Sequence, residues 1–200
     1  MTARHVKSTA SVYQQLGMTI AFYEATGLYG NHLCRPHKFT DRSVNIINDI
    51  GNNDYVLHCF SGSNWLGYDI HSKLPANAIV LESSPLTPSD KSFQNYMRVT
   101  LGVRIPLPMI RLGLNAIGIP TLDNNEAWTT WYKENKPSKN VLILTGKKDK
   151  LLDHTYIEEE YISEDSNNKV ITFQNAGHCN LAKQNLELYQ RTLKEFLSTT

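Results

Sequence analysis

The chain has 200 residues, of which 40% are hydrophobic and 20% are charged, a balance typical of a globular domain and not of a disordered or fibrous chain. Twenty Lys and Arg stand against 19 Asp and Glu, so the net charge of +1 gives no electrostatic reason to expect a nucleic-acid partner. The three cysteines are too few for a disulfide framework, and no Asn-x-Ser/Thr acceptor for glycosylation occurs, which together favour an intracellular setting.

Apolar runs in the chain do not predict a signal peptide or a membrane-spanning helix. The amino-terminal residues carry charges but lack the apolar core of a secretory signal. The most apolar stretch, 103–122, is interrupted by Arg104, Arg111 and three prolines, whereas a spanning helix needs about 20 apolar residues without such breaks. We interpret it as part of a lid or a surface helix pair, with peripheral membrane contact through 103–122 as the alternative.

Short apolar runs typical of buried strands alternate along the chain with segments of helical periodicity. Strands are predicted at 18–23, 55–60, 78–81, 141–145 and 169–173. Helices are predicted at 4–16, 41–50, 64–73, 153–162 and 180–197. Residues 88–136 carry no strand pattern and are predicted to form a helical lid or insertion within a single domain that spans 1–200. The alternation predicts an α/β fold with a mostly parallel sheet flanked by helices.

Three residues of complementary chemistry, Ser61, Asp149 and His178, lie just beyond the ends of three different predicted strands. Because the carboxyl ends of parallel strands meet at one edge of a sheet, we expect these side chains to lie close together. A serine hydroxyl needs a base within hydrogen-bond reach, and the base needs an acid that orients it. The order Ser, Asp, His is that of α/β hydrolases, so the sequence predicts a triad with Ser61 as the nucleophile.

The segment FSGS at 60–63 fits the sharp turn from a strand into a helix on which such a nucleophile is carried. Gly62 lets the backbone pass tightly, and its N–H at a helix start is one candidate oxyanion donor. Cys59 and Ser63, two positions before and after the serine, are small as this turn requires, although the pattern is not G-x-S-x-G. The same residues also fit an ordinary turn between a strand and a helix.

Simpler interpretations exist for each candidate. The alternative for Asp149 is a carboxylate that does no more than cap the turn that follows it. The alternative for His178 is a packed or solvated histidine. Glu82 also ends a predicted strand and is an alternative acid. His58 and Cys59 lie inside a buried strand and are interpreted as core groups. The spacing of His and Cys residues matches no metal site, and no G-x-G-x-x-G follows a strand, so neither a metal nor another cofactor is predicted.

Four segments carry a family resemblance: HCFSGS at 58–63, AIVLESSP at 78–85, VLILTGKKD at 141–149 and AGH at 176–178. In this order they resemble the transmembrane protein 53 family, a eukaryotic group of α/β-hydrolase-like proteins of unknown chemistry. The resemblance implies the same triad of Ser61, Asp149 and His178. It also implies an intracellular location at the nuclear envelope or the endoplasmic reticulum membrane.

The chain departs from the family pattern at three places. Ser63 and Asn64 replace paired glycines, and Glu82 replaces an aspartate. Family members also carry an apolar strand before the first helix, whereas this sequence starts at the turn after that strand. That strand lies between two others in the sheet, so we expect residues 18–23 to pair directly with 55–60 here.

Two functions follow as hypotheses. The first is a serine hydrolase acting on an ester or thioester of a small or lipid-like acyl group, with Leu107, Met109 and neighbouring apolar side chains of the predicted lid lining the acyl pocket. The second is a non-catalytic binding protein of the hydrolase fold at an intracellular membrane, with a vestigial triad.

Overall fold

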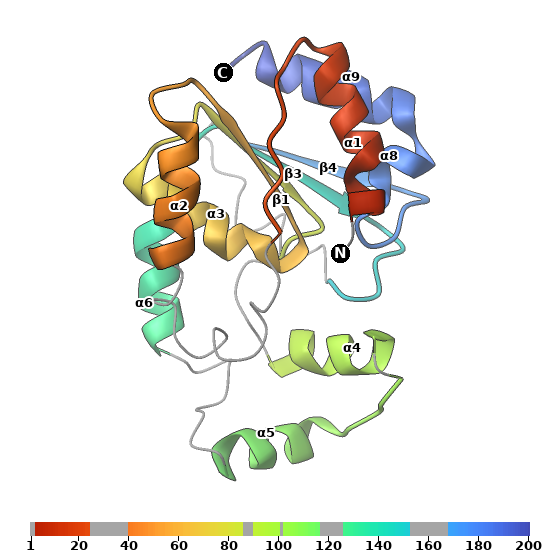
Figure 1. Cartoon of the computed structure of the whole chain (residues 1–200). Coiled ribbons are helices and arrows are strands. Elements are labelled where there is room, and N and C mark those ends of the chain that lie inside the picture. The colour runs from red at the N-terminus through yellow and green to blue at the C-terminus, as the bar shows by residue number, and fades with distance from the viewer. Residues whose placement is uncertain (1–2, 25–39, 86–89, 101, 117–125, 153–167) are drawn as a thin grey trace.

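A computed structural model describes residues 3–24, 40–85, 90–100, 102–116, 126–152 and 168–200 (Figure 1). Within these residues four parallel strands form one sheet in the order β1-β2-β3-β4. The strands are β1 (Val56–Phe60), β2 (Ala78–Glu82), β3 (Val141–Gly146) and β4 (Lys169–Phe173). The predicted α/β fold with a parallel sheet is therefore confirmed.

Helices cover both faces of this sheet, which explains why its two central strands are apolar over 78–81 and 141–144. One face carries α1 (Ala3–Gln15), α8 (Leu181–Gln184) and α9 (Leu186–Leu197). The other face carries α2 (Thr40–Ile50), α3 (Asn64–Lys73) and α6 (Glu126–Asn135). Every residue of β2 and β3 is buried between these two layers.

Successive side chains of the central strands point alternately into the two layers, as the twofold periodicity of a strand requires. Ile79 and Leu81 pack with Trp65 and Tyr68 of α3. The intervening Val80 packs instead with residues of α1, α8 and α9. The sheet thus separates two apolar cores, and the carboxyl ends of its strands are left to present polar side chains.

Two further helices, α4 (Asp90–Thr100) and α5 (Leu107–Ala116), pack against each other and lie beyond the carboxyl ends of the strands (Figure 1). We call them the α4–α5 hairpin. The region 88–136, predicted as one helical insertion, contains this hairpin and also α6, which packs on α3 in the layer that covers the sheet. The ring centroids of Tyr132 on α6 and Tyr68 on α3 are 6.1 Å apart.

The prediction that residues 18–23 form a strand paired with 55–60 is wrong. Residues 18–24 are extended but belong to no ladder, and β1 is the edge strand among the described residues. Met18 and Ile20 pack their side chains against the core beneath α1, and the Tyr23 hydroxyl donates to Asp49 on α2 at 3.3 Å. Partial burial of Met18 and Ile20 and the Tyr23–Asp49 bond hold this segment, so its alternating pattern did not require a neighbouring strand.

The single carboxyl-terminal helix predicted over 180–197 is also wrong in detail, because the chain breaks at Asn185. Asn185 has φ −151° and ψ 82°, and its side-chain oxygen accepts the N–H of Leu188 at 3.1 Å. This is the capping arrangement that begins a new helix, here α9. The helix predicted at 153–162 lies outside the described residues.

Candidate active site

Ser61 occupies the sharp turn between β1 and α3. Its φ of +52° lies in the left-handed region, which costs a residue with a side chain on the order of 1–2 kcal/mol. The Ser63 hydroxyl closes the turn, because its oxygen donates to the carbonyl of Phe60 and accepts the N–H of Phe60, both at 2.8 Å. Strain of this kind persists where surrounding bonds hold it and is concentrated at functional sites.

His178 and Asp149 meet Ser61 at this turn in a continuous chain of hydrogen bonds. The distance from Ser61 Oγ to His178 Nε2 is 3.0 Å, and that from His178 Nδ1 to Asp149 Oδ2 is 2.8 Å. With Nδ1–H donating to the carboxylate, Nε2 is left to accept the serine proton. The structure thus brings together the three residues that the strand ends predict.

The Asp149 carboxylate is fixed by its own loop. Its Oδ1 accepts the N–H of Leu151 at 2.8 Å and that of Leu152 at 3.3 Å, which leaves Oδ2 directed at His178. The Asp149 side chain is 1% exposed and the His178 side chain 25% exposed. A buried carboxylate that orients a partly exposed imidazole is the arrangement in which the imidazole can reach both Ser61 and a substrate.

Backbone bonds join the loops that carry the acid and the base. The N–H of Lys147 donates to Phe173 O at 3.0 Å, and that of Lys148 donates to Ala176 O at 2.9 Å. Gly146 makes this approach possible, because a Cβ at this position would collide with the carbonyl oxygen of Ala176. The relative placement of Asp149 and His178 is therefore set by the ends of two adjacent strands.

Glu82, the alternative acid, lies in a different set of contacts. Its Oε2 accepts the hydroxyl of Tyr189 at 2.7 Å and lies 3.5 Å from His58 Nε2. The other ring nitrogen of His58 is 2.9 Å from the Tyr13 hydroxyl. Burial, followed by the charge of Glu82, raises the pKa of Tyr13 and of Tyr189, so both phenols remain protonated.

These two tyrosines are partners that the sequence reasoning missed. Tyr13 on α1 contacts His58, and Tyr189 on α9 donates to Glu82. Each tyrosine is far from its partner along the chain, so no local spacing predicts these contacts. A buried carboxylate needs a donor such as the Tyr189 hydroxyl, and Glu82 is only 1% exposed. The signal in the sequence is a polar hydroxyl on the otherwise apolar face of each of these two helices, and a search for it could have found both tyrosines.

The two cysteines in the described part of the chain are buried and unpaired. Burial raises the pKa of the Cys59 thiol to about 12. Burial, and then the charges of Glu82 and Asp149, raise the pKa of the Cys179 thiol. Because the thiolate is the reactive form, the raised pKa values disfavour either cysteine as a nucleophile at neutral pH.

Within the ranges that the structure describes, no group of three or more His, Cys, Asp or Glu side chains gathers in the way that a metal site requires. In the same ranges no helix combines the length and the apolar character needed to cross a membrane.

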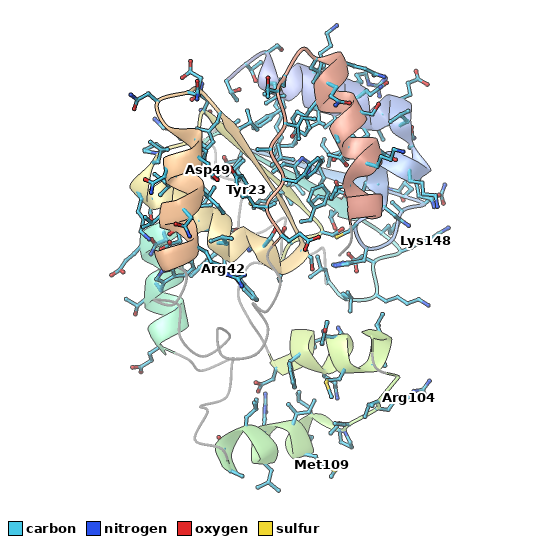
Figure 2. All side chains as sticks on the ribbon, viewed as in Figure 1. Tyr23, Arg42, Asp49, Arg104, Met109 and Lys148 are labelled. Carbon is cyan, nitrogen blue, oxygen red and sulfur yellow. The ribbon has the colours of Figure 1, made fainter. Side chains whose placement is uncertain are left out.

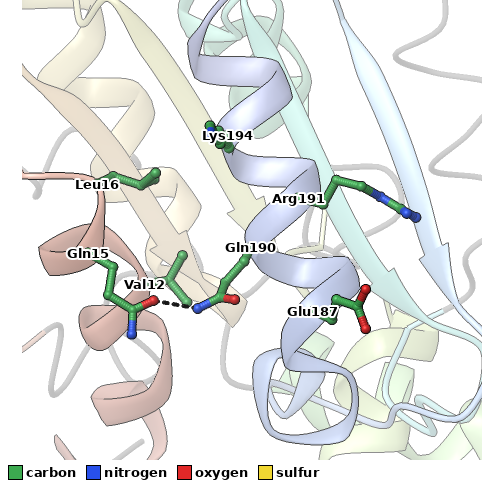
Figure 3. A pocket seen from close by; sticks show the side chains of 7 residues that line it. All are labelled: Val12, Gln15, Leu16, Glu187, Gln190, Arg191 and Lys194. Carbon is green, nitrogen blue, oxygen red and sulfur yellow. Dashed lines mark hydrogen bonds between the residues drawn. The ribbon is translucent and has the colours of Figure 1, made fainter.

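A hollow of about 370 Å³ lies between α1 and α9 (Figure 3). A hydrogen bond from Gln190 to Gln15 crosses it, at 2.5 Å from Nε2 to Oε1. None of the three residues of the hydrogen-bonded chain lines this hollow, so it is separate from the candidate active site.

Solved structures similar to this chain include an esterase and other hydrolases. An esterase of Pyrococcus furiosus, Pf2001, matches with a TM-score of 0.64 and 14% identity over 98% of this chain and 77% of its own. The α/β hydrolase MGS-MChE2, from a lagoon-sediment metagenome, matches with a TM-score of 0.61 and 15% identity over 100% of this chain and 86% of its own. In two further crystal forms of Pf2001 the chain spans 61% and 62% of the solved protein.

At such identities these matches define the fold, and the chain has an α/β-hydrolase fold. No protein-family model and no curated protein matches the sequence. The resemblance to the transmembrane protein 53 family therefore stays a prediction from its motifs.

Proposed function

We propose that the protein is a serine hydrolase that cleaves an ester or thioester of a small or lipid-like acyl group. The observation that carries the proposal is the continuous chain of hydrogen bonds from Ser61 through His178 to Asp149. The esterase and hydrolase names of the structural neighbours support hydrolytic chemistry of this class.

In the proposed mechanism the Ser61 oxygen attacks the acyl carbonyl while His178 Nε2 takes the hydroxyl proton. The imidazolium that forms is stabilised by Asp149, and the N–H of Gly62 donates to the developing oxyanion. His178 then gives the proton to the departing alcohol or thiol, which leaves an acyl group on Ser61. Water attacks this acyl-enzyme with His178 again as the base, and Ser61 is regenerated.

A fluorophosphonate probe tests this proposal, because it reacts covalently with an activated serine. We expect labelling of the wild-type chain and loss of labelling in Ser61→Ala. Ser72→Ala is the matched control, since Ser72 is an exposed serine on α3 whose hydroxyl donates to Asp69 O. If the folded wild-type chain is neither labelled nor able to hydrolyse p-nitrophenyl acetate, the alternative of a binding protein with a vestigial triad replaces the proposal.

A second proposal concerns peripheral membrane contact, which we place on the α4–α5 hairpin. Its exposed apolar side chains are Val99, Val103, Met109 and Leu112, with 46%, 42%, 63% and 71% of their surface accessible. Exposure of Met109 and Leu112 does not support the expectation that they line an acyl pocket. Met109 lies on the side of the hairpin away from the sheet, and Arg104 lies in the connection between α4 and α5 (Figure 2).

The charge of the hairpin favours an anionic lipid surface as the partner. Arg98 and Arg104 are exposed beside the apolar side chains. Asp90, the only acidic residue between 90 and 116, is buried and bound by Arg111 Nε at 2.8 Å. Apolar side chains next to cations are the features by which a helix lies in a membrane interface. The membrane we propose is the nuclear envelope or endoplasmic reticulum, which the family resemblance implies.

Co-sedimentation with vesicles tests this contact. We expect binding to vesicles of phosphatidylcholine and phosphatidylserine, weaker binding to phosphatidylcholine alone, and loss of binding in the double variant Met109→Ser, Leu112→Ser. Phe22→Ser is the control, because Phe22 is 60% exposed but lies on the extended segment after α1. Equal loss in both variants, or no binding by the wild-type chain, contradicts the proposal.

A further inference from the structure

Ser83, the residue that follows β2, is not one of the three hydrogen-bonded residues Ser61, His178 and Asp149. It nevertheless contacts the loop that carries His178. It is 1% exposed and has a φ of +49°. Its N–H donates to Leu144 O at 2.9 Å, so its backbone still belongs to the sheet. Its hydroxyl oxygen accepts the N–H of Cys179 at 3.0 Å.

Cys179 directly follows His178 and is itself held in an uncommon conformation. Its φ is +51°, and the residue is 7% exposed. A buried backbone N–H without a partner costs about 1–3 kcal/mol, so the Ser83 oxygen satisfies a donor that the turn would otherwise leave unpaired. The Ser83 hydroxyl also lies beside the Cys179 thiol, where its contact partly offsets the rise in the thiol pKa.

The backbone around His178 is held from three sides. On the amino-terminal side, Ala176 O accepts the N–H of Lys148 from the Asp149 loop at 2.9 Å. Within the turn, the N–H of Gly177 donates to Asn180 Oδ1 at 2.9 Å. On the carboxyl-terminal side, the tie is the bond from Cys179 to Ser83, which connects the turn to β2.

We propose that Ser83 is a positioning residue for His178, and that its hydroxyl, by holding the backbone at Cys179, keeps the imidazole within reach of Ser61. This inference rests on the proposed hydrolase function. Loss of the tie frees one side of the turn, and a displacement of about 1 Å at a reacting group can lower a rate on the order of 100-fold. Substrate contact is not involved, so the effect belongs to kcat.

Two substitutions at Ser83 separate the hydroxyl from the backbone strain. Ser83→Ala removes the oxygen and keeps a side chain at positive φ, whereas Ser83→Gly removes the oxygen and relieves the strain. Ser84→Ala is the matched control, because Ser84 is an adjacent buried serine whose hydroxyl is 3.3 Å from both Cys59 O and Glu82 O. Hydrolysis of p-nitrophenyl acetate gives kcat and KM, and thermal unfolding gives Tm.

We expect kcat to fall by about 10- to 100-fold in both Ser83 variants, with KM changed by less than about 3-fold, and near-wild-type kcat in Ser84→Ala. The fall should persist in Ser83→Gly even where its Tm equals that of the wild-type chain. Near-wild-type kcat in either Ser83 variant, or a loss that follows Tm across all three variants, overturns the positioning role. Absence of Ser61-dependent hydrolysis in the wild-type chain overturns the proposed function itself, and this inference with it.

Discussion

The strand-end edge that carries Ser61 and the α4–α5 hairpin face each other but are built differently. At the edge, buried polar groups from three strands are joined by hydrogen bonds, and Asp149, Ser83 and Glu82 are all at most 9% exposed. In the hairpin, large apolar side chains face solvent. The hairpin is held by local contacts, which include the bond from Gln94 Nε2 to Ile105 O at 2.8 Å.

This difference indicates that the two regions have different structural requirements. Groups that must keep a fixed geometry lie on elements that the sheet holds, where each buried polar atom constrains its neighbours. Groups that would meet a variable apolar surface lie on an element that can be exposed without disturbing the core. Substitutions at the edge should therefore affect activity and stability strongly, and those on the hairpin should affect contact with a partner.

The largest effect is expected from Asp149→Asn. The amide cannot stabilise the imidazolium and can impose the wrong tautomer on His178, so kcat should fall about 10⁴-fold while the fold is retained. The measurement is hydrolysis of p-nitrophenyl acetate. Glu82→Gln is the comparison, because the amide oxygen can still accept from Tyr189, and kcat should change by only a few-fold. A larger loss in Glu82→Gln than in Asp149→Asn would reassign the acid.

A pair of glycine substitutions compares the two regions by stability. Gly146→Ala should destabilise the chain by about 1–3 kcal/mol, because the new Cβ would force the Asp149 and His178 loops apart. Gly113→Ala on α5 should stabilise its helix by up to about 1 kcal/mol, because a Cβ there meets no atom within 4 Å. Urea denaturation measures both. Shifts of equal size and sign would show that the two regions are equally constrained.

The smallest expected effect is a pH dependence of the free energy of unfolding that arises from His71, in the helical layer on the sheet. His71 near the end of α3 accepts the N–H of Ala76 at Nδ1 at 3.1 Å, and burial lowers its pKa. The folded state therefore favours the neutral imidazole, so its contribution to stability is present above the unfolded pKa of about 6.5 and is lost as pH falls below it. The hairpin, which has no histidine between 90 and 116, supplies no such term.

His71→Asn keeps an oxygen that can accept from Ala76 but cannot take up a proton. Between about pH 7.5 and about pH 5.5 the free energy of unfolding should fall less in this variant than in the wild-type chain. A fall of the same size in both proteins would assign the pH dependence to other groups.

Local patterns predicted much of the fold and of the candidate site. The apolar runs of β2 and β3 are visible because strands buried on both faces need few polar residues. The strand-end rule predicted that Ser61, Asp149 and His178 would gather, since parallel strands finish at a common edge. The catalytic roles of these three residues stay a prediction until the variants are measured.

What the sequence by itself determined is the order of the strands' apolar runs and the residues at their ends, because both depend on periodicity over a few positions. Only the tertiary structure decided which carboxylate faces His178, that residues 18–24 lie beside the core without joining the sheet, and that Ser83 holds the backbone at Cys179. These outcomes depend on lateral distances between segments far apart in the chain and on the direction of single side chains. Periodicity fixes neither, because hydrogen bonding and burial at each position are settled by the neighbours that folding brings there.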